Sequence, residues 1–91
     1  MPVNTNSEVI YPVTIDLKVI MFSVPGDEKN ISDLNAILNR LMIPLTKEWT
    51  VTKSTGGNYN SYTGKIFITS KEIMYALFEE LNRHPNVKFA I

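Results

Sequence analysis

The apolar residues of this chain change their spacing along its length, and the order of those changes restricts the folds that it can adopt. Between residues 13 and 22 they alternate with polar residues, which predicts a strand with one face on a core. The alternation returns over 47–54, 59–69 and 87–91. Over 31–42 and 70–83 the apolar residues recur at three- and four-residue steps, which predicts two amphipathic helices.

Turn and cap residues set the expected limits of these helices. Residues 23–30, SVPGDEKN, have the composition of a loop, and Asn30 is expected to cap the first helix. Thr69 and Glu72 match a capping box at the start of the second, although Ser70 is an alternative first residue. A proline follows each helix and ends it. The apolar stripe of the first helix consists of Ile31, Leu34, Ile37, Leu38, Leu41 and Met42.

The order strand–helix–strand–strand–helix–strand predicts an α+β, ferredoxin-like fold. Two right-handed crossovers place both helices on one face of a four-stranded antiparallel sheet of order 4-1-3-2. Gly64 interrupts the inward face of the third strand, where we expect a bulge or a close helix approach. Val87, Phe89 and Ile91 are expected to point inward from the last strand. Residues 10–91 form one domain in this interpretation, preceded by a flexible tail over 1–9.

The overall composition excludes several classes of protein. Nine basic and nine acidic residues cancel, which argues against nucleic acid as a partner. The absence of cysteine excludes disulfides and thiolate metal sites and fits a reducing compartment. The chain begins with neither a signal peptide nor a long apolar run, so we expect a cytoplasmic protein without a membrane partner.

The glycine-rich stretch at 53–64, KSTGGNYNSYTG, suits a turn better than a phosphate-binding loop. Its glycines are adjacent, its lysine precedes them, and a strand rather than a helix follows. Gly56 and Gly57 are expected to supply two positive-φ residues to a tight hairpin. If the hairpin also contacts a ligand or partner, the candidate residues are Lys53, Ser54, Gly57, Asn58, Tyr59 and Ser61.

No group of residues in the sequence indicates an enzyme. His84 has no nucleophile nearby and is expected at an exposed helix end. The adjacent acids at 27–28 lie in the expected loop, and those at 79–80 diverge on a helix, so neither pair resembles an acid–base pair. An acylphosphatase needs an arginine in the first loop, which here has only Lys29. We therefore predict no catalytic residues, metal or cofactor.

The face of the sheet away from the helices offers a second candidate surface. Phe22 and Phe67 are expected there on the central strands, with Lys18 and Lys65 nearby. Single-stranded nucleic-acid binding through these residues is one hypothesis, because RNA-recognition domains stack bases on such strands. The stretch KIFIT lacks their sequence pattern, however. Exposed aromatic residues on an open sheet more often mark a protein contact.

Three stretches resemble the YbeD-like family of small bacterial proteins of unknown function. KSTGGNYNSYT resembles its K-G-N-Y-x-S hairpin, YPVTIDLKVIM its opening strand and HPNVKFAI its closing strand, together covering about 10–91. The glycine that commonly follows the family's K-V-M run is missing at Phe22. The resemblance implies a ferredoxin-like fold similar to regulatory ACT domains, with no accepted catalytic residues. It implies a non-catalytic regulatory or protein-interaction module, with a homodimer or another protein as partner and a small-molecule ligand near 23–30.

Overall fold

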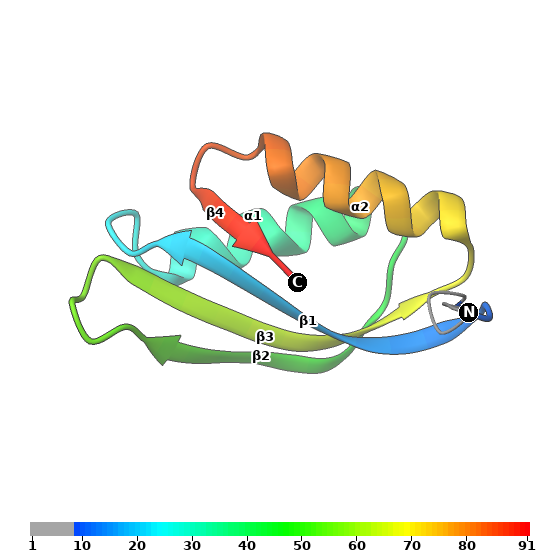
Figure 1. Cartoon of the computed structure of the whole chain (residues 1–91), viewed down its shortest axis with the longest axis horizontal. Coiled ribbons are helices and arrows are strands. Elements are labelled where there is room, and N and C mark those ends of the chain that lie inside the picture. The colour runs from blue at the N-terminus through cyan, green and yellow to red at the C-terminus, as the bar shows by residue number, and fades with distance from the viewer. Residues whose placement is uncertain (1–8) are drawn as a thin grey trace, which may run out of the picture.

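The computed structural model describes residues 9–91, and its elements follow the predicted order (Figure 1). The predicted tail over 1–9 lies outside the described residues apart from Val9. The elements are β1 (Val13–Phe22), α1 (Asp27–Arg40), β2 (Leu45–Lys53), β3 (Tyr59–Ile68), α2 (Lys71–Arg83) and β4 (Val87–Ala90). No helix among residues 9–91 has the length and apolar character needed to cross a membrane.

The four strands form one antiparallel sheet of order β2-β3-β1-β4, which confirms the predicted order read from the other edge. Both helices lie on one side of it, and the described residues leave the opposite face uncovered (Figure 1). The central strands β1 and β3 pair over ten residues, from Val13 opposite Ile68 to Phe22 opposite Tyr59. Their long, regular register gives the uncovered face its framework.

The core lies between the sheet and the helices, and strict alternation in β3 supplies much of it. Every second residue from Asn60 to Ile68 is buried, and the intervening residues, among them Phe67, face away from the helices. This alternation confirms the predicted faces of that strand. The buried apolar residues are Leu17, Val19, Met21, Leu34, Ile37, Leu38, Ile43, Tyr62, Ile66, Ile68, Leu77 and Leu81.

The predicted start of the first helix was wrong. α1 begins at Asp27, and the amide of Asn30 donates to the carbonyl of Gly26, so Asn30 lies inside the helix instead of capping it. Gly26 has a φ of 94°, which turns the chain directly into the helix without a side-chain cap. The acids at 27–28 then suit the positive end of the helix dipole. At the other end Met42 lies beyond the helix and is exposed, so it is not part of the buried stripe.

The second helix begins at the alternative cap. The Ser70 side chain accepts a hydrogen bond of 3.2 Å from the amide of Ile73, and Thr69 lies outside the cap. A serine hydroxyl at this position satisfies one of the amide groups that the first helical turn leaves without a partner. The capping box predicted from Thr69 and Glu72 is therefore replaced by a cap one residue later.

The inward directions predicted for Phe89 and Ile91 were also wrong, because both side chains are exposed. Ile20 pairs with Phe89, but the next residue of β1, Met21, pairs with Val87, so β4 contains one extra residue at Lys88. This bulge reverses the alternation, because the residues on either side of the extra one take different faces. Val87 and Ala90 therefore pack against the core, and Phe89 emerges on the uncovered face.

The glycine hairpin contains one positive-φ residue instead of two. Gly57 has a φ of 79°, whereas Gly56 has no positive φ. The amide of Ser54 donates to the carbonyl of Tyr59, which closes a loop of four residues, 55–58. Within it the Gly57 amide donates to the Ser54 carbonyl. Residues 54–57 therefore form a single turn, and Gly57 is its last residue. A four-residue hairpin loop built around a single turn needs only one left-handed residue, at the end of that turn.

Candidate functional site

The residues at the hairpin end of the uncovered face form an apolar cluster across three strands. Phe22 of β1 lies opposite Tyr59 of β3, and their ring centroids are 5.2 Å apart at an angle of 40°. In the next row Ile20 lies opposite Ser61 on one side and Phe89 of β4 on the other. We call Ile20, Phe22, Tyr59 and Phe89 the hairpin-end patch.

The patch is exposed although its residues are large and apolar. Phe22 is 39% exposed and Phe89 is 47% exposed, while Ile20 and Tyr59 are half-buried. The ammonium of Lys88 lies 5.3 Å from the centroid of the Tyr59 ring, a geometry that suits a cation–π contact. The Tyr59 ring is therefore contacted by both Phe22 and Lys88 before any partner arrives.

A shallow hollow of about 120 Å³ lies beside the patch. It is lined by Ile20, Thr52, Lys53, Ser54, Tyr59, Asn60 and Ser61. Pockets that enclose a small organic ligand measure roughly 300–1,000 Å³, so this hollow has room for one side chain of a partner rather than for a metabolite.

The candidate residues of the hairpin gather here, but most of their polar groups maintain the hairpin itself. The Ser54 hydroxyl accepts from the Tyr59 amide at 3.2 Å, and the Ser61 hydroxyl donates to the Thr52 carbonyl at 3.4 Å. The Lys53 ammonium turns to the helix side, where it lies 3.4 Å from an Asp27 carboxylate oxygen. Tyr59 is the hairpin residue whose ring belongs to the uncovered face.

The loop after β1 is attached to the same hairpin. The Ser23 amide donates to the Asn58 carbonyl at 2.9 Å, and the Ser23 hydroxyl donates to the Gly57 carbonyl. Gly57 and Asn58 thus contribute main-chain acceptors that hold this loop against the hairpin. The part of the loop that the sequence offered as a small-molecule site is occupied by these internal contacts.

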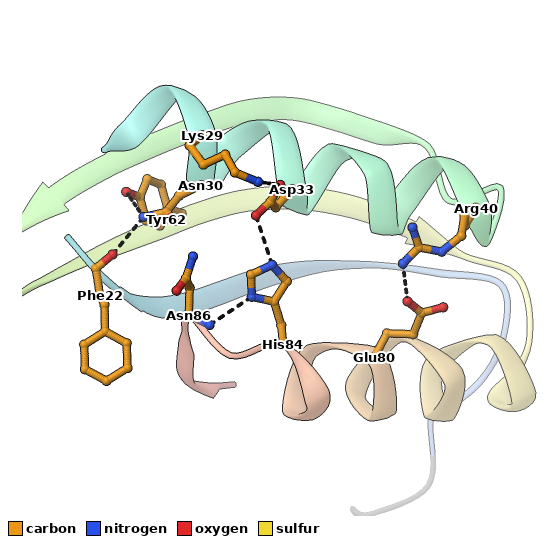
Figure 2. A network of polar contacts seen from close by, with 9 residues as sticks. All are labelled: Phe22, Lys29, Asn30, Asp33, Arg40, Tyr62, Glu80, His84 and Asn86. Carbon is orange, nitrogen blue, oxygen red and sulfur yellow. Dashed lines mark hydrogen bonds and ion pairs between the residues drawn. The ribbon is translucent and has the colours of Figure 1, made fainter. Parts of the chain in front are cut away.

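A buried polar network lies beneath the patch on the helix side of the sheet. The Asn30 side-chain amide donates to the Phe22 carbonyl at 2.9 Å and to the Tyr62 hydroxyl at 3.0 Å (Figure 2). The Tyr62 hydroxyl donates in turn to Asp27 at 2.7 Å, and Asn60 donates to the same oxygen at 2.8 Å. Asn30 and Tyr62 are fully buried. The network therefore ties α1 to the strand ends from which Phe22 and Tyr59 emerge.

Sequence reasoning missed this network, although two signals pointed to it. Asn60 is polar at an inward position of its strand, and Asn30 lies four residues before Leu34 and seven before Ile37, on the apolar face of its helix. A buried amide needs partners, so each position indicated a polar contact in the core. The pair of acids at 27–28, expected in a loop, instead begins α1, and Asp27 reaches the network.

Hydrogen bonding holds the pKa of Asp27 below its ordinary range, with the Tyr62 hydroxyl as the largest cause and Asn60 and Lys53 adding to it. A carboxyl whose pKa is lowered by folding stabilises the protein above its unfolded pKa, and that contribution is lost as the pH falls through the folded pKa. Burial raises the pKa of the Tyr62 hydroxyl, so this group stays protonated and donates at neutral pH.

Replacing Asp27 with asparagine should therefore reduce the loss of stability in acid. The variant is expected to be less stable than the wild type at pH 7, and the difference should shrink once the pH falls below the unfolded pKa of about 3.9 and on through the lower pKa of the folded carboxyl. Urea unfolding at pH 7, 4 and 3 measures this effect. The exposed Glu28→Gln change in the same turn is the matched control. Parallel stability–pH curves for wild type and Asp27→Asn would contradict the assignment.

His84 is half-buried between the helices rather than at an exposed helix end, which corrects the prediction. Its Nε2 lies 3.0 Å from a carboxylate oxygen of Asp33, and its Nδ1 accepts from the Asn86 amide at 3.0 Å (Figure 2). Lys29 bonds the other oxygen of Asp33 and, with His84, holds the pKa of that carboxyl below its ordinary range. Both nitrogens of His84 are therefore engaged in joining α2 and the following turn to α1.

The remaining charged candidates form ion pairs. Glu80 pairs with Arg40 between the helices, and Glu79 pairs with Arg83 four residues on. The divergence predicted for residues 79–80 is thus confirmed. No cluster of three or more potential metal ligands occurs among residues 9–91.

The other residues proposed for the uncovered face do not join the patch. Phe67 lies opposite Thr14, eight residues along the ladder from the row that holds Phe22, or roughly 26 Å at the rise of a strand. Lys65 forms an ion pair of 2.8 Å with Asp16, which lies directly opposite it on β1. Lys18 is exposed in the row next to Ile20. The two phenylalanines of the nucleic-acid hypothesis therefore do not form one platform.

Comparison with known proteins places this chain in a family. The UPF0250 protein of Leptothrix cholodnii is 31% identical over 81 residues, which cover 89% of this chain and 87% of that protein. The solution structure of protein HP0495 from H. pylori superposes with a TM-score of 0.72 at 20% identity, covering 92% of this chain and 86% of that one, so it shares the fold. The profile of the family described as "Protein of unknown function (DUF493)" matches residues 6–91. These matches confirm the family predicted from the hairpin and the strands, and the chain belongs to the DUF493 family.

Proposed function

We propose that this protein is a non-catalytic interaction module that binds another protein through the hairpin-end patch. The observation that carries the proposal is the pair of large aromatic side chains, 39% and 47% exposed, on a sheet face that the helices do not cover. Exposed apolar clusters with a polar surround mark contact sites, and aromatic side chains are enriched at the centres of protein interfaces.

The framework of the patch favours binding because its residues are already ordered. The strands that carry Phe22 and Tyr59 pair over their full length, and Asn30 fixes the main chain at Phe22 from the other side. Ordering flexible side chains on association costs free energy, so a prearranged surface binds more tightly for the same contact area. The hollow next to Tyr59 offers a recess for one side chain of the partner.

Other functions receive less support from the same geometry. Base stacking needs an open ring face, but Phe22 and Lys88 already contact the Tyr59 ring. ACT-like sensing of a small molecule has too little space in the hollow and no free main-chain groups at Ser23. An acid–base mechanism has little support where Asp33 and His84 bind each other.

The test compares two surfaces of the same protein. Three tagged proteins are expressed in the native host: the wild type, the double variant Phe22→Ser/Phe89→Ser and the control Tyr75→Ser. Each is cross-linked to the proteins that it contacts, and the captured proteins are quantified. Tyr75 is a large side chain that is 67% exposed on α2, in the opposite layer. We expect one or a few proteins to be captured equally by the wild type and the control and at least about tenfold less by the double variant, since central interface residues carry most of the binding energy.

Thermal unfolding shows whether the variants remain folded. Both serine changes lie on the surface, so we expect all three proteins to unfold at similar temperatures. Capture that the double variant retains in full, or capture that the control loses equally, would refute the patch as the binding surface.

A further inference from the structure

The zero net charge of the chain hides a separation of charge between its two layers. The strands carry five lysines and two acids, a formal charge of +3, whereas the helices carry six acids and four bases, a formal charge of −2. The uncovered face therefore belongs to the positive layer. Charged surfaces steer association toward partners of opposite sign even when the whole protein is neutral.

Two of the lysines flank the hairpin-end patch. The ammonium of Lys88 lies over the Tyr59 ring. Lys18 lies in the row next to Ile20, and its main-chain amide and carbonyl form hydrogen bonds with the main chain of Ile91, the residue after β4. Neither lysine forms an ion pair with a residue among 9–91. Lys53 does not contribute to this surface, because it turns to Asp27 on the helix side.

The acids of the strands lie away from the patch. Asp16 is two residues beyond Lys18 on the same strand, and it is paired with Lys65. Glu48 lies on β2 between Lys47, which pairs with Lys65, and Thr50, which pairs with Thr63. It is therefore also outside the rows of the patch. The patch is thus an apolar centre with cations at its margin and no carboxylate among the rows that form it.

A second copy of this chain fits such a surface poorly. A two-fold dimer through the uncovered face would bring the same lysines of both copies to one interface, because such an interface uses one patch twice. Like charges brought together at close range repel, and a partially dehydrated interface strengthens the repulsion. The surface instead matches a partner whose apolar side chain is flanked by carboxylates.

We propose that the partner presents an acidic segment with one large apolar side chain to the hairpin-end patch. The apolar side chain packs on Phe22 and Phe89, and the flanking aspartates or glutamates pair with Lys18 and Lys88. This inference rests on the proposed function and adds the chemistry of the partner. Charges at the margin of an interface set its selectivity and association rate, while the apolar centre supplies most of the affinity.

Nucleic acid is also anionic, but the patch suits it less well than it suits an acidic protein segment. A base stacks on the face of a ring, and the Tyr59 ring is contacted by Phe22 on one side and approached by the Lys88 ammonium. The remaining apolar surface is offered by side chains on three strands, which suits an aliphatic or aromatic side chain of a protein.

The experiment selects random 12-residue peptides, displayed on phage, against two immobilised proteins. The first is the wild type and the second is Lys18→Glu/Lys88→Glu. We expect the wild type to select peptides in which a large apolar residue lies between acids, and the swapped variant to select basic residues in their place. A selected acidic peptide should bind Lys88→Glu about tenfold or more weakly than it binds Lys71→Glu, an exposed helix change with the same net charge.

The outcomes separate the two proposals. Peptides without a charge preference that still lose binding to Phe22→Ser/Phe89→Ser would overturn the acidic partner and keep the binding surface. Peptides that bind this double variant fully, or a library that yields no binder, would overturn both. A dimer in sedimentation that Phe89→Ser dissociates would make a second copy the occupant. Salt-sensitive binding of a ten-nucleotide oligouridine that Lys88→Glu weakens, without peptide selection, would make nucleic acid the partner.

Discussion

Replacing Asn30 with alanine should lower the free energy of unfolding by about 2–3 kcal/mol. The change removes the amide that donates to the Phe22 carbonyl and to the Tyr62 hydroxyl, in a position that is fully buried. A buried carbonyl left without its donor costs roughly 1–3 kcal/mol, and the space left by the side chain adds to that cost. The Asn30 side-chain oxygen has no partner of its own, which keeps the loss below the sum of both effects.

Urea unfolding of Asn30→Ala beside Asn39→Ala measures the effect. Asn39 is exposed near the end of the same helix, so its replacement should change the stability by less than about 0.5 kcal/mol. Adding Tyr62→Phe to each variant tests the contact directly. The two changes should be less than additive in Asn30→Ala/Tyr62→Phe, because the second removes a bond that the first has already broken. Equal stability of the two asparagine variants would contradict the role of the network.

This network connects stability with the proposed binding surface. Phe22 is held through its main chain from the core side and offers its ring on the uncovered face (Figure 2). Loss of the Asn30 bonds should free the end of β1 and so raise the cost of ordering Phe22 when a partner binds. The same residue type on the surface would have no such effect, because water would replace the lost partner.

Hydrophobic periodicity predicted the element order, and the right-handedness of the two crossovers then predicted the sheet topology. Each strand has one face on the core, so the apolar residues of β1 and β3 reveal both the strand and the face that it buries. The start of α1 was missed because Asp27 and its neighbours have the composition of a loop. Their helical state depends on partners that are distant in sequence, since Asp27 is held by Tyr62 and Asn60 of β3.

The candidate site was predicted in part for a similar reason. Tyr59 and Phe22 were recognised from the hairpin and from the strand pattern, and they do meet. Phe89 was assigned to the core because no local signal marks the bulge at Lys88. The separation of charge was hidden as well, because a total charge of zero shows nothing until the topology assigns each residue to a layer.

Replacing Gly64 with alanine should destabilise the protein by about 1–3 kcal/mol, although alanine is intrinsically the better strand residue. A Cβ at this position would lie 3.0 Å from the Trp49 ring, 3.1 Å from Leu45 and 3.2 Å from the main-chain carbonyl of Lys47. The register of β2 shifts opposite Gly64, so the expected bulge lies in the partner strand, and a strand instead of a helix makes the close approach. Overpacking of this kind forces side chains or backbone to move.

The sign of the effect distinguishes this contact from an ordinary strand glycine. In open space the change from glycine to alanine would stabilise the strand by roughly 0.5–1 kcal/mol, through the smaller entropy of the unfolded chain. Trp49→Leu removes the nearest ring atom, so Gly64→Ala should cost less when it is made in that background. Thermal and urea unfolding of the two single variants and the double variant measure this coupling, with Thr63→Ala on the uncovered face as a control. A stabilised Gly64→Ala protein would show that β2 is free to move away from Gly64, and the close approach of Trp49 would then have no energetic role.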